Sequence, residues 1–235
     1  MRKIIIASTS TLYNGAYLDY LLPTLKNHFE NVRTLLFIPY ARPSGISHEE
    51  YTNKVKSAFS NLNIEVKGIY EFENPTEAVQ HAEAIFTGGG NTFVLVNELY
   101  KNNLLDTIEK VVNNGTPYLG TSAGSNICGL TIGNTNDMPI VYPPNFKTLG
   151  FVPFNINPHY LDTEVNSEHM GETRETRINE FHHFNPQSVL GIREGSWLEV
   201  KGTSIILKGN LTARLFKRNE NPIEVEPETE LNYLK

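Results

Sequence analysis

Short apolar runs alternate with longer amphipathic stretches through the first half of the chain. Each run has Gly, Pro or Ser at or just after its end, which is the pattern of a buried strand. The predicted strands are residues 3–7, 33–40, 64–70, 82–90 and 116–124.

The segments between these runs carry apolar residues at three- and four-residue steps, as helices with one buried face do. The predicted helices are residues 16–29, 48–62 and 91–115. Pro23 is expected to kink or restart the first helix, and Ser47 is a suitable N-cap for the second. The third segment predicts two helices that meet near Asn102 and Asn103, with Gly115 closing the second.

The alternation of strand and helix predicts a largely parallel sheet with helices on both faces, which is a three-layer α/β sandwich. In the second half the pattern changes to short strands, which predict a mixed or antiparallel extension. These strands are residues 139–142, 189–194, 196–202, 204–209 and 213–218, and a helix over 171–184 interrupts them. No repeat, linker or composition break divides the chain, so we expect a single domain over residues 1–235.

The net charge of −6 argues against a nucleic-acid or anionic-membrane partner, because such partners are usually met by a basic face. A single cysteine cannot form an internal disulfide, so a reducing compartment suits the chain. The N-terminal apolar run spans about five residues, shorter than the ~7–15 of a signal-peptide core. No run approaches the ~20 residues that span a bilayer. We therefore expect a cytoplasmic protein, with a homodimer as an open alternative to a monomer.

Residues 120–124 form a Gly-Thr-Ser-Ala-Gly sequence between a predicted strand and the start of a helix. A nucleophile on such a bend needs small neighbours, because the strained turn brings the flanking backbones close together. On its own this G-x-S-x-G pattern more often describes a tight turn than a catalytic serine. Ser122 occupies the apex, whereas Ser125 lies one turn inside the helix and Cys128 lies among apolar neighbours.

A catalytic serine requires a base that accepts its proton, and His159 is the candidate. It follows an apolar run and Pro158, which places it at the end of a predicted buried strand, at the same sheet edge as Ser122. A strand-end histidine that only caps backbone groups is the alternative.

The base in turn requires an orienting acid. Glu194 ends another apolar strand and is followed by a glycine, and Asp137 and Asp162 compete with it. The remaining histidines are expected on helices or in a polar loop, the first three of them at the surface: His28, His48, His81, His169, His182 and His183.

Seven motifs along the chain carry a resemblance to a known family. They are FIPYA (37–41), GGGNTF (88–93), GTSAGSN (120–126), TNDMPIV (135–141), INPH (156–159), GETRETRI (171–178) and REGSW (193–197). In this order they resemble peptidase E, the α-aspartyl dipeptidases, a serine peptidase family on a fold similar to the class I glutamine amidotransferases. The resemblance covers nearly the whole chain. Thr121 departs from it, because the family tends to have a bulky aromatic residue there.

The resemblance implies a role for each matching residue. Ser122 resembles the nucleophile, His159 the general base and Glu194 the acid that orients it. Arg174 in GETRE resembles the arginine that binds an aspartyl carboxylate, with Arg177 as the fallback. The implied activity is hydrolysis of the bond after an N-terminal aspartate in Asp-X dipeptides, through an acyl-enzyme.

The two glycine-rich stretches are expected to face one crevice, because both follow strands of one parallel sheet. The oxyanion is then expected to bind the backbone N–H groups of Ala123 and Gly89. Further residues expected at the substrate are Gly88, Gly90, Asn91 and Asp137. For Asp137 the alternatives are shaping the site, binding the substrate amino group, or only turning the chain.

Two other functions stay open at this point. One is a related serine hydrolase or a cyanophycinase-like peptidase of different specificity, and the other is a non-catalytic binding protein on the same scaffold. No H-E-x-x-H or Cys/His ligand spacing occurs, so we expect no metal and no cofactor. The expected partner is a small Asp-X peptide.

Overall fold

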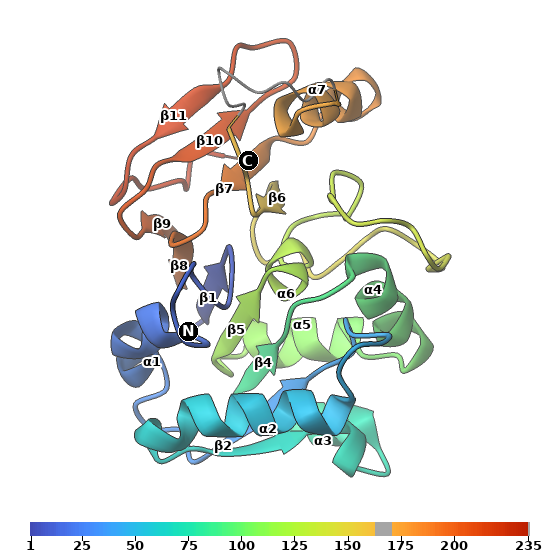
Figure 1. Ribbon diagram of the computed structural model, residues 1–235, viewed down its shortest axis with the longest axis vertical. Helices are drawn as coiled ribbons and strands as arrows, with labels where there is room; N and C mark the ends of the chain where they lie inside the picture. Colours follow the sequence, from blue (N-terminus) through green and yellow to red (C-terminus); the bar gives the residue numbers. More distant parts are fainter. Residues whose placement is uncertain (163–170, 235) are drawn as a thin grey trace.

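The five apolar runs of the first half form neighbouring parallel strands in the computed structural model, which describes residues 1–162 and 171–234 (Figure 1). They are β1 (Lys3–Ala7), β2 (Thr34–Ile38), β3 (Glu65–Gly68), β4 (Ile85–Thr87) and β5 (Tyr118–Thr121). Two later strands, β8 (Trp197–Lys201) and β9 (Ser204–Lys208), extend the sheet antiparallel beyond β1. The order β3-β2-β4-β5-β1-β8-β9 confirms the predicted sheet and its extension. His169 lies outside the described residues.

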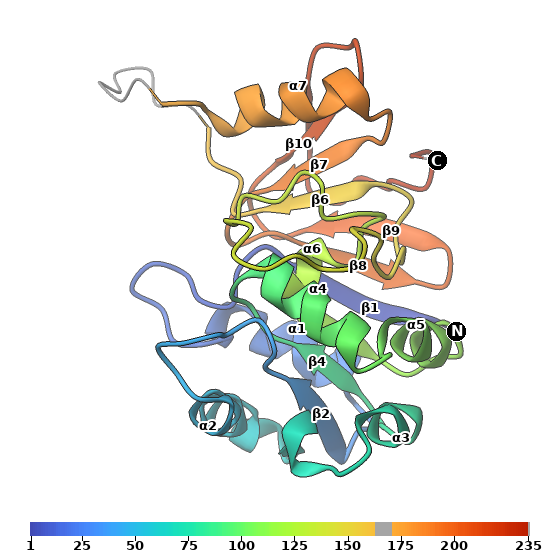
Figure 2. The ribbon, with the colours of Figure 1, turned by 90° about the vertical axis from the view of Figure 1, so that its right-hand side faces the viewer.

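Helices cover both faces of this seven-stranded sheet and give the predicted three layers (Figure 2). One face carries α1 (Leu22–His28) and α2 (His48–Phe59), and the other carries α3 (Pro75–Gln80), α4 (Thr92–Lys101) and α5 (Leu105–Asn113). Single 3-10 turns occur at Asp19–Leu21, Ser60–Leu62 and Ile69–Glu71. The sequence pattern did not predict α3, because its six residues are too few to show a helical period.

The predicted helix boundaries have identifiable causes. Pro23 lies in the first turn of α1, so it restarts the helix after a 3-10 turn. Ser47 caps α2, where its Oγ accepts a hydrogen bond from the N–H of Glu50 at 3.1 Å. Asn103, with a φ of 53°, separates α4 from α5.

The remaining strands form a second sheet of four strands, in the order β11-β10-β7-β6. Its strands are β6 (Asn155–Pro158), β7 (Val189–Ile192), β10 (Ala213–Phe216) and β11 (Ile223–Val225). β6 and β7 are parallel, and α7 (Arg174–Phe184) packs against the sheet through Ile178 and Phe181 (Figure 2). The predicted extension is therefore divided: β8 and β9 join the large sheet, and β7 and β10 join the small one.

The predicted strand over 139–142 is wrong, because these residues form no strand. Pro139 lacks an N–H group, and Pro143 and Pro144 follow at once, so the segment has few donors for a strand ladder. Ile140 and Tyr142 are 54% and 94% exposed, which shows that the apolar side chains here are not buried.

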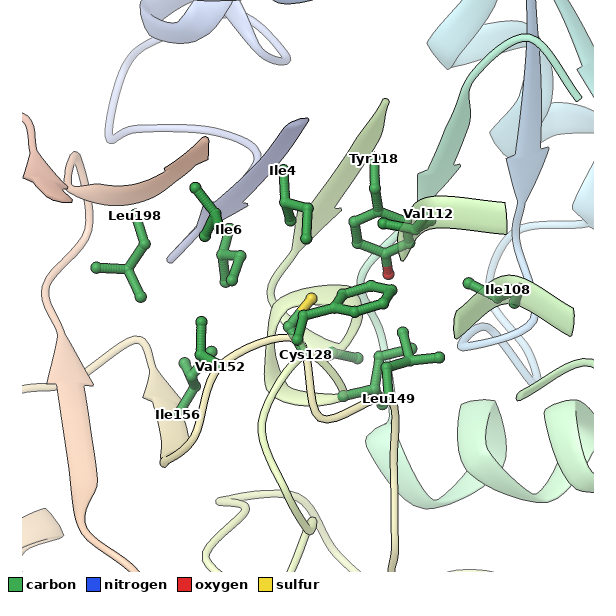
Figure 3. Close-up of a cluster of buried hydrophobic side chains, with 14 of the residues drawn as sticks. Ile4, Ile6, Ile108, Val112, Tyr118, Cys128, Leu149, Val152, Ile156 and Leu198 are labelled. Atoms are coloured by element: carbon green, nitrogen blue, oxygen red, sulfur yellow. The ribbon is translucent and has the colours of Figure 1, made fainter. Parts of the chain in front are cut away.

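An apolar cluster joins the two sheets and makes them one packed body (Figure 3). It contains Ile4 and Ile6 of β1, Leu198 of β8 and Ile156 of β6, and Cys128 lies among them. Since both sheets contribute to the same core, their edges stay at a fixed distance. None of the helices in residues 1–162 and 171–234 combines the length and the apolar character that crossing a bilayer requires.

The prediction that His28 lies at the surface is wrong. It is only 9% exposed, and its Nε2 lies 3.1 Å from the carbonyl oxygen of Tyr118 in β5. Burial lowers the pKa of His28 to about 4, so the ring is neutral at pH 7. Polar neighbours in the sequence misled the prediction, because the ring turns inward to a strand carbonyl.

Candidate active site

Ser122 occupies a strained bend between β5 and the short helix α6 (Ala123–Asn126). Its φ of 55° and ψ of −115° lie in a region that residues with a side chain rarely adopt. The bend is held on both sides: Ser122 N donates to Ala7 O at 3.2 Å, and Ser122 O accepts from Asn126 N at 2.9 Å. The strain therefore persists because the surrounding backbone fixes it.

Two glycines allow the backbone to approach the bend closely. A Cβ on Gly124 would overlap the carbonyl oxygen of Thr87 in β4. A Cβ on Gly89 would lie 2.8 Å from the Cβ of Ser122 and 3.2 Å from its Oγ. The two glycine-rich stretches therefore face each other as predicted, and only glycine fits between them.

The other two candidates for the nucleophile are buried and have structural partners. Ser125 is fully buried, and its hydroxyl lies 2.6 Å from the carbonyl oxygen of Ala7 and 2.8 Å from that of Gly120. Cys128 is also fully buried, and burial raises the pKa of its thiol well above the ordinary range. Among these three side chains, Ser122 is the one at the pocket surface.

His159 and Glu194 complete a hydrogen-bonded chain with Ser122. His159 Nε2 lies 2.8 Å from Ser122 Oγ, and His159 Nδ1 lies 2.6 Å from Glu194 Oε1. His159 has a φ of 54°, and its N–H donates to Ser8 Oγ at 2.8 Å. Ser8 in turn donates its hydroxyl proton to Ile192 O at 2.7 Å. Ser8 thus ties the histidine to the end of β7, a role that sequence reasoning missed because no local pattern marks it.

The three residues come from two sheets, so the expectation of a single sheet edge is wrong. Ser122 follows β5 of the large sheet, whereas His159 follows β6 and Glu194 lies just beyond β7 of the small sheet. The carboxyl ends of these strands meet because the two sheets share one core. The three side chains therefore lie together although the chain pattern placed them in one continuous sheet.

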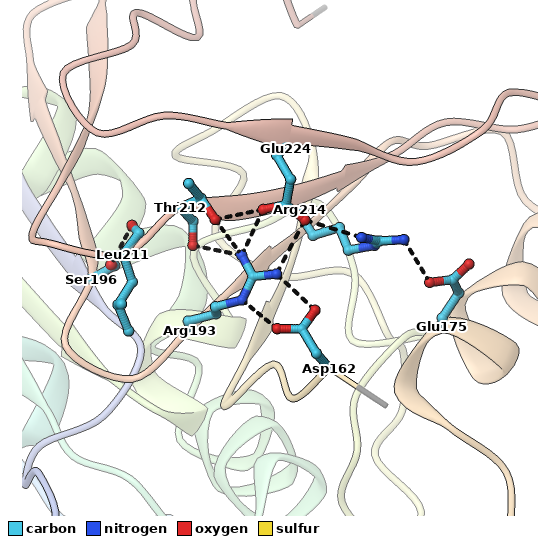
Figure 4. Close-up of polar contacts among 8 residues, drawn as sticks. All are labelled: Asp162, Glu175, Arg193, Ser196, Leu211, Thr212, Arg214 and Glu224. Carbon is cyan, nitrogen blue, oxygen red and sulfur yellow. Dashed lines mark hydrogen bonds and ion pairs between the residues drawn. The ribbon is translucent and has the colours of Figure 1, made fainter. Parts of the chain in front are cut away.

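An ion-pair network fixes the segment that carries Glu194 (Figure 4). Arg193 bonds bidentately to Asp162, with both N···O distances at 2.7 Å, and it also pairs with Glu224 at 2.8 Å. These partners raise the pKa of Arg193, whose side chain is 15% exposed. Asp162, a competitor for the acid in the sequence, therefore binds Arg193 and not His159.

The same network reaches the helix that carries Arg174. Arg214 pairs with Glu224 at 3.1 Å and with Glu175 at 3.0 Å, as Figure 4 shows. Glu175 is the residue after Arg174 at the start of α7. The N-terminus of α7 is also capped by Thr173, whose Oγ1 accepts from Thr176 N at 3.0 Å. The start of α7 is thus anchored through Thr173 and Glu175, the residues on either side of Arg174.

Arg174 lines a small pocket of about 160 Å³ beside Ser122, which we call the Arg174 pocket. Its lining includes Arg174, Asp137, Asn126, Thr135, Ser122 and His159. Burial and the neighbouring Arg177 lower the pKa of Arg174, and the charge of Asp137 opposes this. Arg177 is not part of this lining; it is exposed and pairs with Glu172 at 3.5 Å.

Asp137 and Asn91 connect the pocket to the start of α4. Asp137 Oδ2 accepts a hydrogen bond from Thr92 N at 2.7 Å. Asn91 caps α4 through its Oδ1, which accepts from Val94 N at 3.1 Å, and its Nδ2 donates to Met138 O at 2.9 Å. Both polar atoms of Asn91 therefore have structural partners, so the structure places Asn91 as a support of the pocket.

The expected oxyanion donors differ in their present partners. Ala123 is the first residue of α6, where a backbone N–H has no acceptor within the helix. Gly89 N donates to Tyr51 Oη at 2.9 Å. Gly88 packs against the same tyrosine, since a Cβ there would lie 2.6 Å from Tyr51 Oη. Tyr51 belongs to α2, far from the glycines in sequence, so only the fold brings it to the site.

Asn126 is another site residue that the sequence did not single out, although it ends the GTSAGSN motif. It is 1% exposed, lines the Arg174 pocket, and its Oδ1 has no hydrogen-bond partner within the described residues. A buried amide oxygen without a partner is costly unless a ligand donates to it. Within residues 1–162 and 171–234, no group of three or more His, Cys, Asp or Glu side chains is arranged to hold a metal ion.

Comparisons with known proteins identify the family of the chain. The sequence pattern of peptidase family S51 matches residues 4–208. A Streptomyces coelicolor protein named "Peptidase E" is 43% identical over 232 residues, covering 99% of this chain and 94% of the relative. A Drosophila melanogaster protein named "Probable alpha-aspartyl dipeptidase" is 44% identical over 236 residues, covering 99% and 97%.

A solved structure of a peptidase from an acI-B1 actinobacterium is similar in fold, with a TM-score of 0.73 at 16% identity, over 98% of this chain and 96% of that one. At this identity the likeness supports the fold alone. The sequence match is stronger, because it extends over most of the chain and includes the motifs around Ser122, His159 and Glu194. The family pattern over most of the chain and relatives at 43% and 44% identity show that the chain belongs to peptidase family S51, a family of serine peptidases.

Proposed function

We propose that this peptidase hydrolyses the bond after an N-terminal aspartate in Asp-X dipeptides. The observation that carries the proposal is the Arg174 pocket, a small pocket that adjoins Ser122 and His159 and contains one cation, Arg174, and one carboxylate, Asp137. Relatives named for peptidase E and aspartyl dipeptidase activity support it. The single free cysteine, which is buried, suits a reducing compartment, and we place the protein in the cytoplasm.

In the proposed mechanism, His159 Nε2 takes the Ser122 proton as Oγ attacks the aspartyl carbonyl, and it then returns a proton to the leaving amine. Glu194 keeps Nδ1 protonated and stabilises the imidazolium, because its Oε1 lies 2.6 Å from that nitrogen. Water then attacks the acyl-enzyme, with His159 again acting as base, and aspartate leaves.

The tetrahedral oxyanion binds the N–H groups of Ala123 and Gly89 in this mechanism. An anionic oxygen is a stronger acceptor than a phenol, so it displaces Tyr51 Oη from Gly89 N. Replacing Tyr51 by Phe removes the competing oxygen and should leave kcat unchanged or raised. A fall of about 100-fold would instead assign the oxyanion donor to the Tyr51 hydroxyl.

Arg174 selects the aspartyl side chain by binding its carboxylate, because a neutral side chain would leave the half-buried guanidinium without a partner. Asp137 and the Oδ1 of Asn126 are acceptors in the same pocket, and in this mechanism they receive the substrate's α-ammonium group. The pocket thus recognises both charged groups of an N-terminal aspartate.

The test is a dipeptide panel of Asp-Leu, Glu-Leu and Ala-Leu, measured as kcat/KM. We expect wild type to prefer Asp-Leu over Ala-Leu by about 10⁴-fold, because an uncharged side chain leaves the half-buried guanidinium without its partner. Arg174→Met should abolish this preference. Arg177→Met, on the same helix but exposed, is the matched control and should keep it. Equal wild-type rates on all three peptides would contradict the proposal.

A further inference from the structure

A second pocket is also lined by Ser122, and the proposed mechanism assigns it no ligand. It has a volume of about 550 Å³. We call it the Arg42 pocket; its lining includes Arg42, Lys54, Tyr17, Tyr51, Ser122 and His159. Ser122 and His159 are the two residues that it shares with the Arg174 pocket. A substrate bound across Ser122 therefore occupies both pockets.

The Arg42 pocket is cationic. Its lining contains Arg42 and Lys54 and, within the described residues, no Asp or Glu. Neither cation takes part in an ion pair in residues 1–162 and 171–234. Two cations without a carboxylate partner, next to a reactive serine, form a site for an anionic group.

Two tyrosines position these cations. The Arg42 guanidinium lies 5.7 Å from the centre of the Tyr51 ring, and the Lys54 ammonium lies 4.8 Å from that of Tyr17. The two rings meet edge to face with centroids 6.3 Å apart. Tyr51 is 3% exposed, and its hydroxyl accepts a hydrogen bond from Gly89 N. The pair of tyrosine rings is therefore fixed relative to the glycines beside Ser122.

The chemistry of a dipeptide supplies the matching anion. With the aspartyl residue in the Arg174 pocket, the leaving residue extends into the Arg42 pocket. Its Cα lies about 3.8 Å from the aspartyl Cα, and its α-carboxylate is one bond further. In a longer peptide or a C-terminal amide this position carries no charge.

We propose that Arg42 and Lys54 bind the free α-carboxylate of the leaving residue and so select peptides of two residues. Arg42 grips the carboxylate bidentately, and Lys54 adds a point charge. This inference rests on the proposed function, because it requires the aspartyl residue in the Arg174 pocket. It predicts a preference for peptides of two residues that arises from charge recognition and not from a steric wall.

The experiment compares kcat/KM on Asp-Leu, Asp-Leu-amide and aspartyl p-nitroanilide for wild type, Arg42→Gln, Lys54→Met and Lys56→Met. Lys56 is the matched control, since it lies on the same helix, is exposed, and pairs with Glu71 outside the pocket. We expect wild type to prefer Asp-Leu over its amide by about 10- to 100-fold. Arg42→Gln should lower only the Asp-Leu value, by a similar factor, and Lys54→Met should lower it less.

The two substrates whose leaving group carries no carboxylate report on catalysis itself, so their values should stay within about twofold in all four proteins. Equal wild-type values on Asp-Leu and its amide would overturn the carboxylate site while leaving the proposed function intact. So would an equal loss on all three substrates in Arg42→Gln, because that would indicate a general distortion. Failure of wild type on all three aspartyl substrates would refute the proposed function, and the carboxylate site with it.

Discussion

Ser122 and His159 belong to two sheets that hold their side chains in different ways. On the large sheet, backbone geometry fixes the serine: a strained bend, close glycines and hydrogen bonds to β1. On the small sheet, side chains fix the histidine and its acid, through Ser8 and the Arg193 network. A backbone bend of this kind tolerates almost no substitution, whereas an ion-pair network distributes its contribution over several side chains.

The first prediction compares Ser122, which follows a strand of the large sheet, with Glu194, which follows a strand of the small sheet. Ser122→Ala should lower kcat by about 10⁶-fold, because no other group at the bend can form the acyl-enzyme. Glu194→Gln should lower it by about 10⁴-fold, because the neutral amide no longer stabilises the imidazolium. Steady-state kinetics on Asp-Leu measure both. A Glu194→Gln enzyme with wild-type kcat would remove the acid from the proposed chain.

The second prediction concerns the backbone side of the comparison. Gly124→Ala should lower the free energy of unfolding by about 3 kcal/mol, because its Cβ overlaps the Thr87 carbonyl and β4 cannot move aside. Gly150→Ala is the control: its φ is 61° but no atom lies within 4 Å of the added Cβ, so it should cost about 1 kcal/mol. Urea unfolding measures both, and equal losses would show that close approach at β4 is unimportant.

The third prediction concerns the network on the small sheet. Arg193→Gln should lower kcat by about 10- to 100-fold with little change in KM, because the segment bearing Glu194 loses its anchor to Asp162. Combined with Glu194→Gln its effect should be much less than additive, since both act through His159. Lys208→Gln is the control, because it breaks an ion pair with Glu228 that lies outside the Arg193 network. This variant should leave kcat unchanged. An additive double variant would indicate a purely structural role for Arg193.

The fourth prediction separates the two sheets by pH. Burial lowers the pKa of His28 from 6.5 to about 4 in the folded protein. Between these two pH values the unfolded chain binds a proton at His28 and the folded protein does not, so the free energy of unfolding falls as pH drops from 6.5 toward 4. The loss between pH 7 and pH 5 should be about 2 kcal/mol. Arg193 holds the pKa of Glu224 down to about 2, so its contribution is lost only as pH falls from 4.5 toward 2.

Urea unfolding at pH 7 and pH 5 checks this order. His28→Leu should reduce the difference in unfolding free energy between the two pH values, whereas Glu224→Gln should leave that difference unchanged. If Glu224→Gln reduced it and His28→Leu did not, the small sheet would be the acid-sensitive one.

Local sequence patterns predicted the large sheet because its parallel strands are continuous apolar runs, and both faces of such strands are buried. They also predicted the bend at Ser122, since small residues at fixed spacing are a local requirement. They failed at 139–142, where the apolar residues are exposed and prolines remove donors, and at β11, whose first two residues are exposed. Short or exposed segments have no period from which burial can be inferred.

The sequence by itself determined the strands of the large sheet, the apex position of Ser122, and the candidates His159, Glu194 and Arg174. The tertiary structure alone decided that the base and the acid come from a second sheet, and that Ser8, Tyr51 and Arg193 support the site. It also brought Arg42 and Lys54 into one pocket with Ser122. The reason is physical: strand and turn signals are local, whereas these contacts join residues far apart in the chain, and only the packing of the shared core sets their distances.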